Sequence, residues 1–404
     1  AKNFNPSPTP TLTKSLTMSL TLGRYLFSRL GPSPSHSIEN LERADILRTL
    51  LLLTHRRLRL LEPSSEPTAL LGAAADCAGS ALGSNANSGI LSSFFRRRKP
   101  IGEVRDVLHR ELNDQCREIF GRFRSIDSII EGATDGSEES SRRRELYNKT
   151  LDEILRGDGK PTVSPRTAVA DHLIFKGVDD GTDRLDGAGY APSVRPSVLP
   201  RAGAGLFVSG KAVAGSILAY LPGICFLNEH LRGEGGLDRF RDDPDHQLSL
   251  RRDGHVLDCR GCGAPDRSVV CNPWALGQYA NHPSVKSPRP DRPDGPNCFA
   301  VPMDYMSGPE GCLDIGDGGD GDHALRQYIP NTYSSKPAAV LGMNVDILSG
   351  RRVEMRGMVL LATRDVQDEE VYYDYRLPTS APESWPDWYT PVPIDSSVNL
   401  HDDL

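Results

Sequence analysis

The stretch of residues 359–375, near the end of the chain, limits the range of possible folds more than any other stretch. Val359–Ala362 is an unbroken apolar run, which predicts a buried strand. The polar residues of 364–368 predict a turn, and Val371–Tyr373 favours extended structure again. Two carboxylates then stand beside a cluster of phenols, and these residues are Glu369, Glu370, Tyr372, Tyr373 and Tyr375. Such a cluster is unusual for a plain hairpin, so this segment is a candidate functional site.

The composition predicts a folded protein with long loops. The 404 residues suffice for one large or two ordinary domains, and a hydrophobic share of 38% makes a packed core feasible. The 38 glycines and 31 prolines predict extended loops. A formal net charge of -7 argues against broad nucleic-acid binding, and no apolar run approaches membrane-spanning length. We therefore expect neither a membrane nor a clear nucleic-acid partner.

The cysteines and the first residues bear on the cellular compartment. Eight cysteines lack the spacing of a disulfide scaffold, which favours reduced thiols and an intracellular location. Residues 1–36 contain no Asp or Glu and are rich in Ser, Thr and Pro, as in a mitochondrial transit peptide or a disordered leader. The basic run Phe94–Lys99 suits a nuclear localisation signal or, as we favour, a solvated charge run. Nucleus, cytoplasm and mitochondrion all stay open.

Residues 37–160 carry helical patterns and form the predicted helical N-terminal region. A first helix begins near Ser37 and stops at Pro63, and a third covers about 142–156. The second shows a clear apolar stripe through Val104, Leu108, Leu112, Cys116, Ile119, Phe120 and Phe123. These helices are expected to form a bundle or to pack on the following domain. Residues 161–195 are expected to be a linker, since residues 157–195 are rich in Gly, Asp and Pro.

The second half contains three further patterns in a definite order. Gly203-Ala204-Gly205-Leu206 precedes an apolar strand, and because no helix follows, a dinucleotide-binding turn is excluded. Asn281-His282 follows, and Pro296-Asn297 stands beyond a Pro-rich insertion. The Glu-Glu and tyrosine string of 369–375 comes last.

This order resembles that of the SET-domain protein-lysine methyltransferases, and within them the SET domain-containing protein 9 group. The resemblance covers about residues 196–377. It implies an α+β fold in which a β-rich SET domain, with short-stranded sheets and pseudoknot-like threading, follows the helical N-terminal region. The implied activity is S-adenosylmethionine-dependent N-methylation of a lysine in a partner protein.

The resemblance also implies a role for individual residues. Tyr375 would be the catalytic residue, with its hydroxyl beside the sulfonium. The cofactor would be held by Gly203, Ala204, Gly205, Leu206, Asn281, His282 and Tyr375. Glycine would be needed because a Cβ would collide with the ligand. The channel for the lysine would be lined by Tyr220, Tyr279 and Tyr373. Glu369 and Glu370 would fix the turn by hydrogen bonding rather than act as bases.

Several alternatives stay open at this point. Residues 224–270 would be a variable insert. Its Cys259 and Cys262 have the spacing of half a zinc site, which Cys271 and either His255 or Cys298 would complete. We favour no metal. The aromatic and Pro-rich tail 378–404 is expected to fold over the lysine channel. A catalytically idle SET-fold scaffold is the alternative function.

Overall fold

A computed structural model gives the structure of the protein. It describes residues 46, 49, 52, 53, 56, 101–131, 138–156, 165–179, 184–186, 188–227, 231, 248–251, 254–260, 272–283, 295–307, 323–334, 345–346, 351–375 and 389. The predicted leader, the basic run and most of the tail lie outside these residues. The helix expected after Ser37 is represented by five helical positions between 46 and 56.

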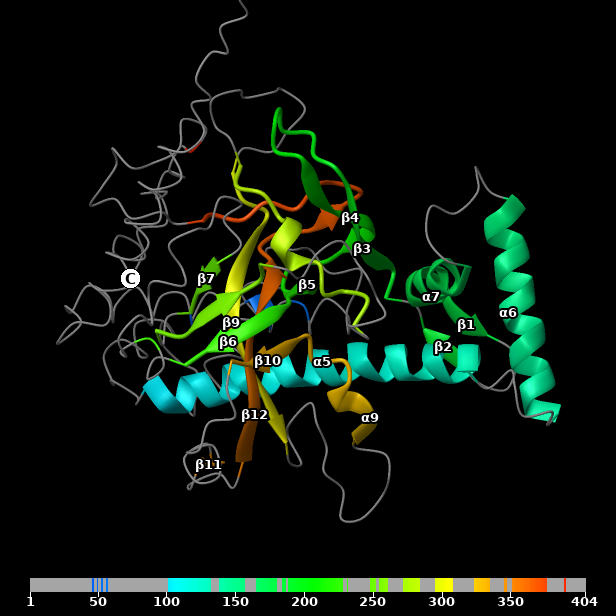
Figure 1. Cartoon of the computed structure of the whole chain (residues 1–404), viewed down its shortest axis with the longest axis horizontal. Coiled ribbons are helices and arrows are strands. Elements are labelled where there is room, and N and C mark those ends of the chain that lie inside the picture. Colours follow the sequence, from blue (N-terminus) through cyan, green and yellow to red (C-terminus); the bar gives the residue numbers. More distant parts are fainter. Residues whose placement is uncertain are drawn as a thin grey trace, which may run out of the picture.

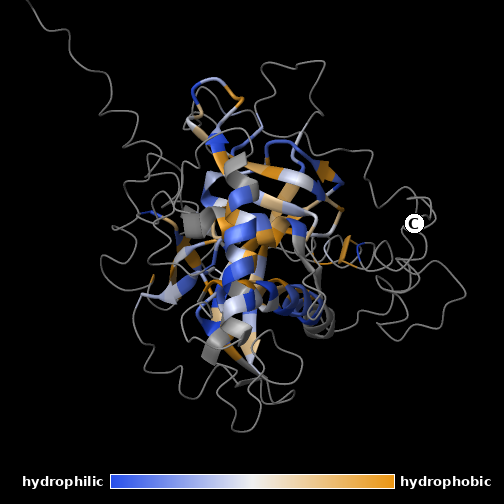
Figure 2. Ribbon diagram, turned by 90° about the vertical axis from the view of Figure 1, so that its right-hand side faces the viewer, coloured by the Kyte–Doolittle hydropathy of each residue, from blue (hydrophilic) through white to orange (hydrophobic). Residues whose placement is uncertain are grey.

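The described helices differ in length, and the longest has 31 residues. They are α5 (Ile101–Glu131), α6 (Glu138–Arg156), α7 (Pro165–Lys176), α9 (His323–Arg326) and the 3-10 turn η3 (Gly277–Tyr279). In Figure 1, α5 crosses the central strands, and α6 and α7 lie toward one end of the molecule, next to β1 and β2. Figure 2 shows α6 as mainly hydrophilic in front of more hydrophobic strands. None of the helices in the described part of the chain is both long and apolar enough to cross a membrane.

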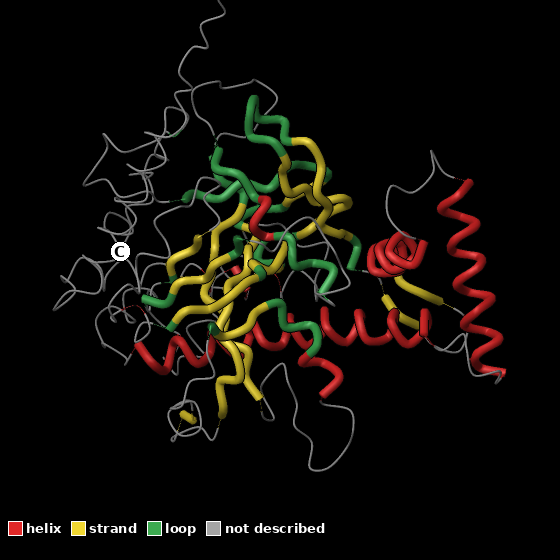
Figure 3. The backbone as a smooth tube through the Cα atoms, viewed as in Figure 1, coloured by secondary structure: helices red, strands yellow, loops and turns green. Residues whose placement is uncertain are grey.

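Most of the strands are short, and they form several small sheets (Figure 3). They are β1 (Gly177–Asp179), β2 (Arg184–Asp186), β3 (Tyr190–Pro196), β4 (Ala204–Ala212), β5 (Ile217–Leu221), β6 (Gly223–Phe226), β7 (Leu248–Leu250), β8 (Val256–Asp258), β9 (Cys298–Ser307), β10 (Asn331–Tyr333), β11 (Val345–Asp346), β12 (Arg351–Ala362) and β13 (Val366–Gln367). Pairing is antiparallel between these strands, except that β10 runs parallel to β6. With its helices, this is an α+β architecture.

The longest strand, β12, organises the core. It pairs with β9 along most of its length and with β5 on its other side. The predicted apolar run Val359–Ala362 forms its end, and each of these four residues is fully buried. A strand that is covered on both faces has apolar residues at every position, because each side chain is buried. The predicted buried strand is therefore confirmed.

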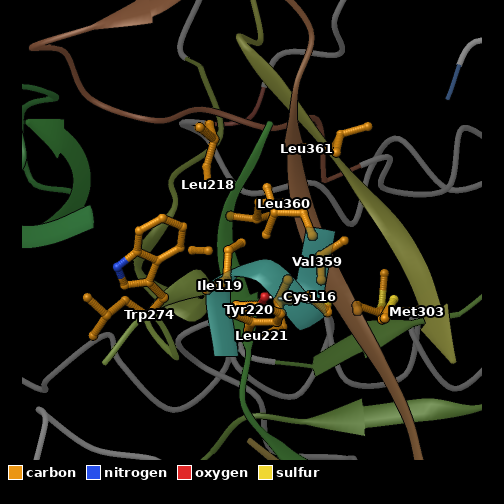
Figure 4. Close-up of a cluster of buried hydrophobic side chains, with 14 of the residues drawn as sticks. Cys116, Ile119, Leu218, Tyr220, Leu221, Trp274, Met303, Val359, Leu360 and Leu361 are labelled. Carbon is orange, nitrogen blue, oxygen red and sulfur yellow. Dashed lines mark hydrogen bonds between the residues drawn. The ribbon is translucent and has the colours of Figure 1, made fainter. Parts of the chain in front are cut away.

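Helix α5 packs directly against the β-rich part. Its Phe120 ring lies 5.5 Å from that of Tyr220 and 6.2 Å from that of Tyr305. Figure 4 shows Cys116 and Ile119 of this helix within a cluster of strand residues. Gln115 donates to Gly215 O at 2.9 Å and accepts from Ile217 N at 3.2 Å, so a buried side chain joins the helix to β5. Helix α5 therefore packs on the domain that follows it, which was one of the two expected arrangements, and its residues belong to the same core as the strands.

The expected linker at 161–195 contains regular structure. Helix α7 buries Val169 and Leu173, and β3 begins at Tyr190, whose ring lies 5.1 Å from Trp274. The linker prediction was wrong because four-residue apolar spacing was hidden among Gly, Asp and Pro residues, which are typical of loops. The domain therefore begins well before residue 196.

The expected insert, 224–270, also contributes to the framework. Its strands β6 and β8 pair with each other, β7 pairs with β8, and β10 completes the sheet. Cys225 and Leu257 are fully buried in it. This part of the insert is therefore a component of the fold rather than a peripheral loop.

Candidate functional site

Three segments that are distant in the sequence meet after the end of β12. The chain leaves β12, pairs with β4 through β13, and continues along β4 to a bridge between Glu370 and Phe207. Tyr372 then bridges Asn281, and Tyr373 bridges Cys298, both in parallel. The glycine string, the Asn-His pair and the tyrosine string are therefore adjacent in space.

Backbone hydrogen bonds fix this meeting point. Val371 N donates to Leu206 O at 2.7 Å, and Tyr373 N donates to Asn281 O at 3.1 Å. Cys298 N donates to Tyr372 O at 3.1 Å. Because main-chain groups make these contacts, the positions of the segments are tied to the fold itself.

Asn297 reinforces the arrangement with its side chain. Its Nδ2 donates to Glu370 O at 2.8 Å, and its Oδ1 accepts from Tyr372 N at 2.8 Å. The residue is fully buried. The Pro296-Asn297 motif was recognised in the sequence, but Asn297 was not among the predicted site residues. Its amide replaces the backbone partners that an ordinary strand would supply.

The carboxylate of Glu370 lies at the centre of the site. It is buried and accepts four hydrogen bonds, two at each oxygen. The donors are Ser197 Oγ at 2.6 Å, Val198 N at 2.9 Å, Asn281 Nδ2 at 3.0 Å and Tyr372 Oη at 2.7 Å. This number of donors fills the acceptor capacity of a carboxylate. The neighbouring Glu369 instead pairs with Arg364 at 2.6 and 2.8 Å. Glu369 thus fixes the turn as expected, whereas Glu370 joins separate segments.

The two glycines of the string have different surroundings. At Gly205, an added Cβ would lie 2.2 Å from Glu370 Oε1 and 2.8 Å from its Cδ. At Gly203, where φ is +74°, an added Cβ would meet nothing within 4 Å. The need for glycine at 205 therefore comes from a protein carboxylate, a reason that differs from the expected close approach of a ligand. Gly203 and Ala204 are exposed, and open space lies beside Gly203.

Two phenols of the final string lie side by side. The ring centroids of Tyr373 and Tyr375 are 4.8 Å apart. Tyr375 Oη donates to Ala280 O at 3.1 Å, next to the Asn-His pair. Burial raises the pKa of Tyr373 well above its usual value, and the nearby Tyr375 adds to this. Tyr373 is therefore a neutral phenol at physiological pH.

His282 is a buried support for the second of these phenols. Its Nδ1 accepts from Tyr375 N at 3.3 Å, and its ring stacks on that of Tyr389 with centroids 4.4 Å apart. Tyr389 is buried and is the described residue of the C-terminal tail. The tail thus reaches the site at this position, while Trp385 and Trp388 lie outside the described residues.

Tyr220 does not belong to this group. It is fully buried, its hydroxyl lies 3.4 Å from Cys116 Sγ of α5, and Figure 4 shows it within the core cluster. A tyrosine enclosed by core residues cannot line an open channel, so the predicted channel role of Tyr220 is wrong. Strand position and apolar neighbours could not separate the two roles. Tyr279 ends η3, partly buried against the core and one residue before Ala280.

The cysteines considered for zinc are only partly described. Cys259 is buried, whereas Cys262 and Cys271 lie outside the described residues. Within the part of the chain that the structure describes, no group of three or more His, Cys, Asp or Glu side chains could hold a metal ion.

Comparison with protein-family models and with curated proteins finds no match. The assignment of a function therefore depends on the residues and contacts described above.

Proposed function

We propose that the chain is an S-adenosylmethionine-dependent protein-lysine N-methyltransferase with a SET-type fold. The observation that carries this proposal is the meeting of three segments, 203–207, 281–282 and 369–375, through bridges and hydrogen bonds. These segments have the order and residue types of the SET family. A cofactor site built from these three segments requires that they lie next to one another.

The residues around this meeting point fit the proposed cofactor. The backbone at Gly203 and Ala204 is exposed with open space beside Gly203, so a flat or extended ligand can approach it closely. Asn281 adds a polar side chain, and Tyr375 adds a phenol beside it. When bound, S-adenosylmethionine supplies a methyl group on a sulfonium, which is already activated for transfer.

Tyr373 and Tyr375 would receive the lysine and align its amine. A free lysine has a pKa of about 10.4 and carries a proton at neutral pH. Aromatic, partly buried surroundings favour the uncharged amine that attack on a methyl group requires. Because the methyl group is already activated, alignment is the main task of the protein, and good alignment contributes at best roughly 7–11 kcal/mol.

Two bridges made by the segment 369–375 support SET-type threading. Tyr372 and Tyr373 are bridged in parallel to Asn281 and Cys298, respectively. The final segment would then pass beside two segments that are separated by the Pro-rich insertion. The side-chain amide of Asn297 would hold that crossing closed.

Replacing Tyr375 with phenylalanine tests the activity. We expect Tyr375→Phe to lower methyl transfer from radiolabelled S-adenosylmethionine to a protein library by about 100-fold, since an aligned polar group at the reacting centre is lost. The fold should persist, because the lost hydrogen bond to Ala280 O is worth roughly 1 kcal/mol.

Tyr333→Phe is the matched control. Tyr333 is half-buried on β10, and its hydroxyl has no hydrogen-bond partner among the described residues, so transfer should be unchanged. Equal transfer by Tyr375→Phe and the wild type would contradict the catalytic role. If the wild-type protein binds S-adenosylmethionine but transfers nothing to any substrate, the idle scaffold becomes the better assignment.

A further inference from the structure

The guanidinium of Arg195, on the paired strands β3 and β4, is held by neutral groups. Its Nε donates to Ser193 Oγ at 3.2 Å, and its Nη2 donates to Ser209 Oγ. Its Cζ lies 5.3 Å from the centroid of the Phe207 ring. Arg195 is exposed, and no carboxylate of the described residues forms an ion pair with it. Its positive charge is therefore open to a ligand.

Two neighbouring cations differ from Arg195 in this respect. Lys211, further along β4, lies 3.2 Å from the Asp365 carboxylate. Arg364 pairs with Glu369 at 2.6 Å. The protein itself supplies the counter-charge for these two side chains, whereas it holds Arg195 with hydroxyls and an aromatic ring.

The two serines add donors beside the guanidinium. Because each Oγ accepts a hydrogen bond from Arg195, its own hydrogen points away from the guanidinium. Neither hydroxyl hydrogen has an acceptor within the described part of the chain. A guanidinium also carries more N–H groups than these bonds use. Arg195, Ser193 and Ser209 thus form a group of unused donors around one positive charge.

The position of this guanidinium is set before any ligand binds. The Phe207 ring supports its face, and the serines hold its edge. Stacking of arginine on an aromatic ring leaves the N–H groups in its plane free to bind. An arginine that is already ordered loses less side-chain entropy on binding, so the arrangement favours an anion with several acceptor oxygens.

We propose that Arg195, Ser193 and Ser209 form a binding site for the phosphate group of a phosphorylated side chain in a partner protein. Such a phosphate carries a charge of about −1.5 to −2 at neutral pH and strong acceptor oxygens, which match a site made of donors alone. The site is separate from the proposed methyl transfer and does not depend on it.

An isolated phosphate suits this surface better than a nucleic acid does. Asp368 accepts from Gly210 N at 2.7 Å, next to Ser209, and Asp365 lies beside Lys211. A long polyanion would meet these carboxylates and a protein of net charge -7. Phe207 is buried, with Arg195 over its ring, so it offers no open face on which a base could stack.

An array of random-sequence peptides, each present with serine and with phosphoserine at its centre, tests the site. Full-length wild-type protein should bind the phosphorylated forms about 10-fold more tightly on average, as expected for hydrogen bonds to a charged group. Arg195→Gln should reduce this preference to within about 2-fold, because the charge is lost. Arg195→Lys should lose about half or more of it, since the ammonium keeps the charge but lacks the planar fork.

Lys211→Gln is the matched control. It removes an exposed cation from the same strand pair, but one that Asp365 already neutralises, so the full preference for phosphoserine should remain. Circular dichroism of each variant should match that of the wild type, because both side chains are exposed.

Three results would overturn the proposal. The first is equal binding of both peptide forms by the wild type, and the second is an undiminished preference in Arg195→Gln. The third is binding of inorganic phosphate or of a single-stranded oligonucleotide as tightly as the phosphorylated peptides, since the site would then serve a free anion or a nucleic acid. Methyl transfer is measured separately, so none of these results would bear on the proposed function.

Discussion

Replacing Gly205 with alanine should destabilise the protein by about 3 kcal/mol or more and abolish binding of S-adenosylhomocysteine. The introduced Cβ would lie 2.2 Å from Glu370 Oε1 and 3.2 Å from Ser197 Cα, so the carboxylate must leave its position. Its four donors would then lose their shared acceptor inside the fold. Urea unfolding monitored by circular dichroism measures the loss.

Two other glycines provide matched controls for this experiment. Gly121 lies in α5 with nothing within 4 Å of an added Cβ, so Gly121→Ala should stabilise the helix by about 0.5–1 kcal/mol. Gly203→Ala meets no atom but has φ +74°, which should cost about 1 kcal/mol. If Gly205→Ala unfolds at the same urea concentration as the wild type, the added Cβ does not displace the Glu370 carboxylate, and the prediction is wrong.

Removing the buried side chain of Arg251 should have a similarly large effect, about 3–5 kcal/mol. Arg251 is 2% exposed and donates to Asp304 Oδ1 at 2.6 Å, to Met303 O at 2.9 Å and to Gly357 O. Arg251→Ala leaves the Asp304 carboxylate without this partner, and Nε2 of His109 in α5 lies 3.8 Å from its Oδ2. Through these hydrogen bonds, Arg251, which directly follows β7, connects that strand to β9 and β12.

An exposed ion pair serves as the control for Arg251. Arg117 and Asp114 lie 3.1 Å apart on the surface of α5. Solvent and salt screen such a pair, so Arg117→Ala should change stability by less than about 1 kcal/mol. Equal effects of Arg117→Ala and Arg251→Ala would show that the buried pair contributes no more than the exposed one.

The parts of the fold that follow from local patterns were predictable. The apolar stripe of α5 and the run Val359–Ala362 have the periods of a buried helix and a buried strand, and both elements are observed. Helix α7 was not predicted because its Pro and Gly neighbours are typical of linkers. The packing of α5 in the core depends on residues a hundred positions away, which a local pattern cannot reveal.

The site was predictable as a set of segments but not as a set of contacts. The order of the glycine, Asn-His and tyrosine strings indicated which segments to bring together. The role of Glu370 was missed because its partners, such as Ser197, lie 173 positions away in the sequence. Tyr220 was misassigned because a strand tyrosine in a core and one in a channel have the same sequence pattern.

Hydrogen-exchange mass spectrometry with and without S-adenosylhomocysteine tests the central claim most directly. If the three segments hold one ligand, binding should slow exchange in peptides that cover 203–207, 280–282 and 369–375 together. Helix α6, which lies next to β1 and β2 and away from the central strands, should exchange at an unchanged rate (Figure 1). Protection confined to one segment, or protection elsewhere in the chain, would contradict a shared cofactor site.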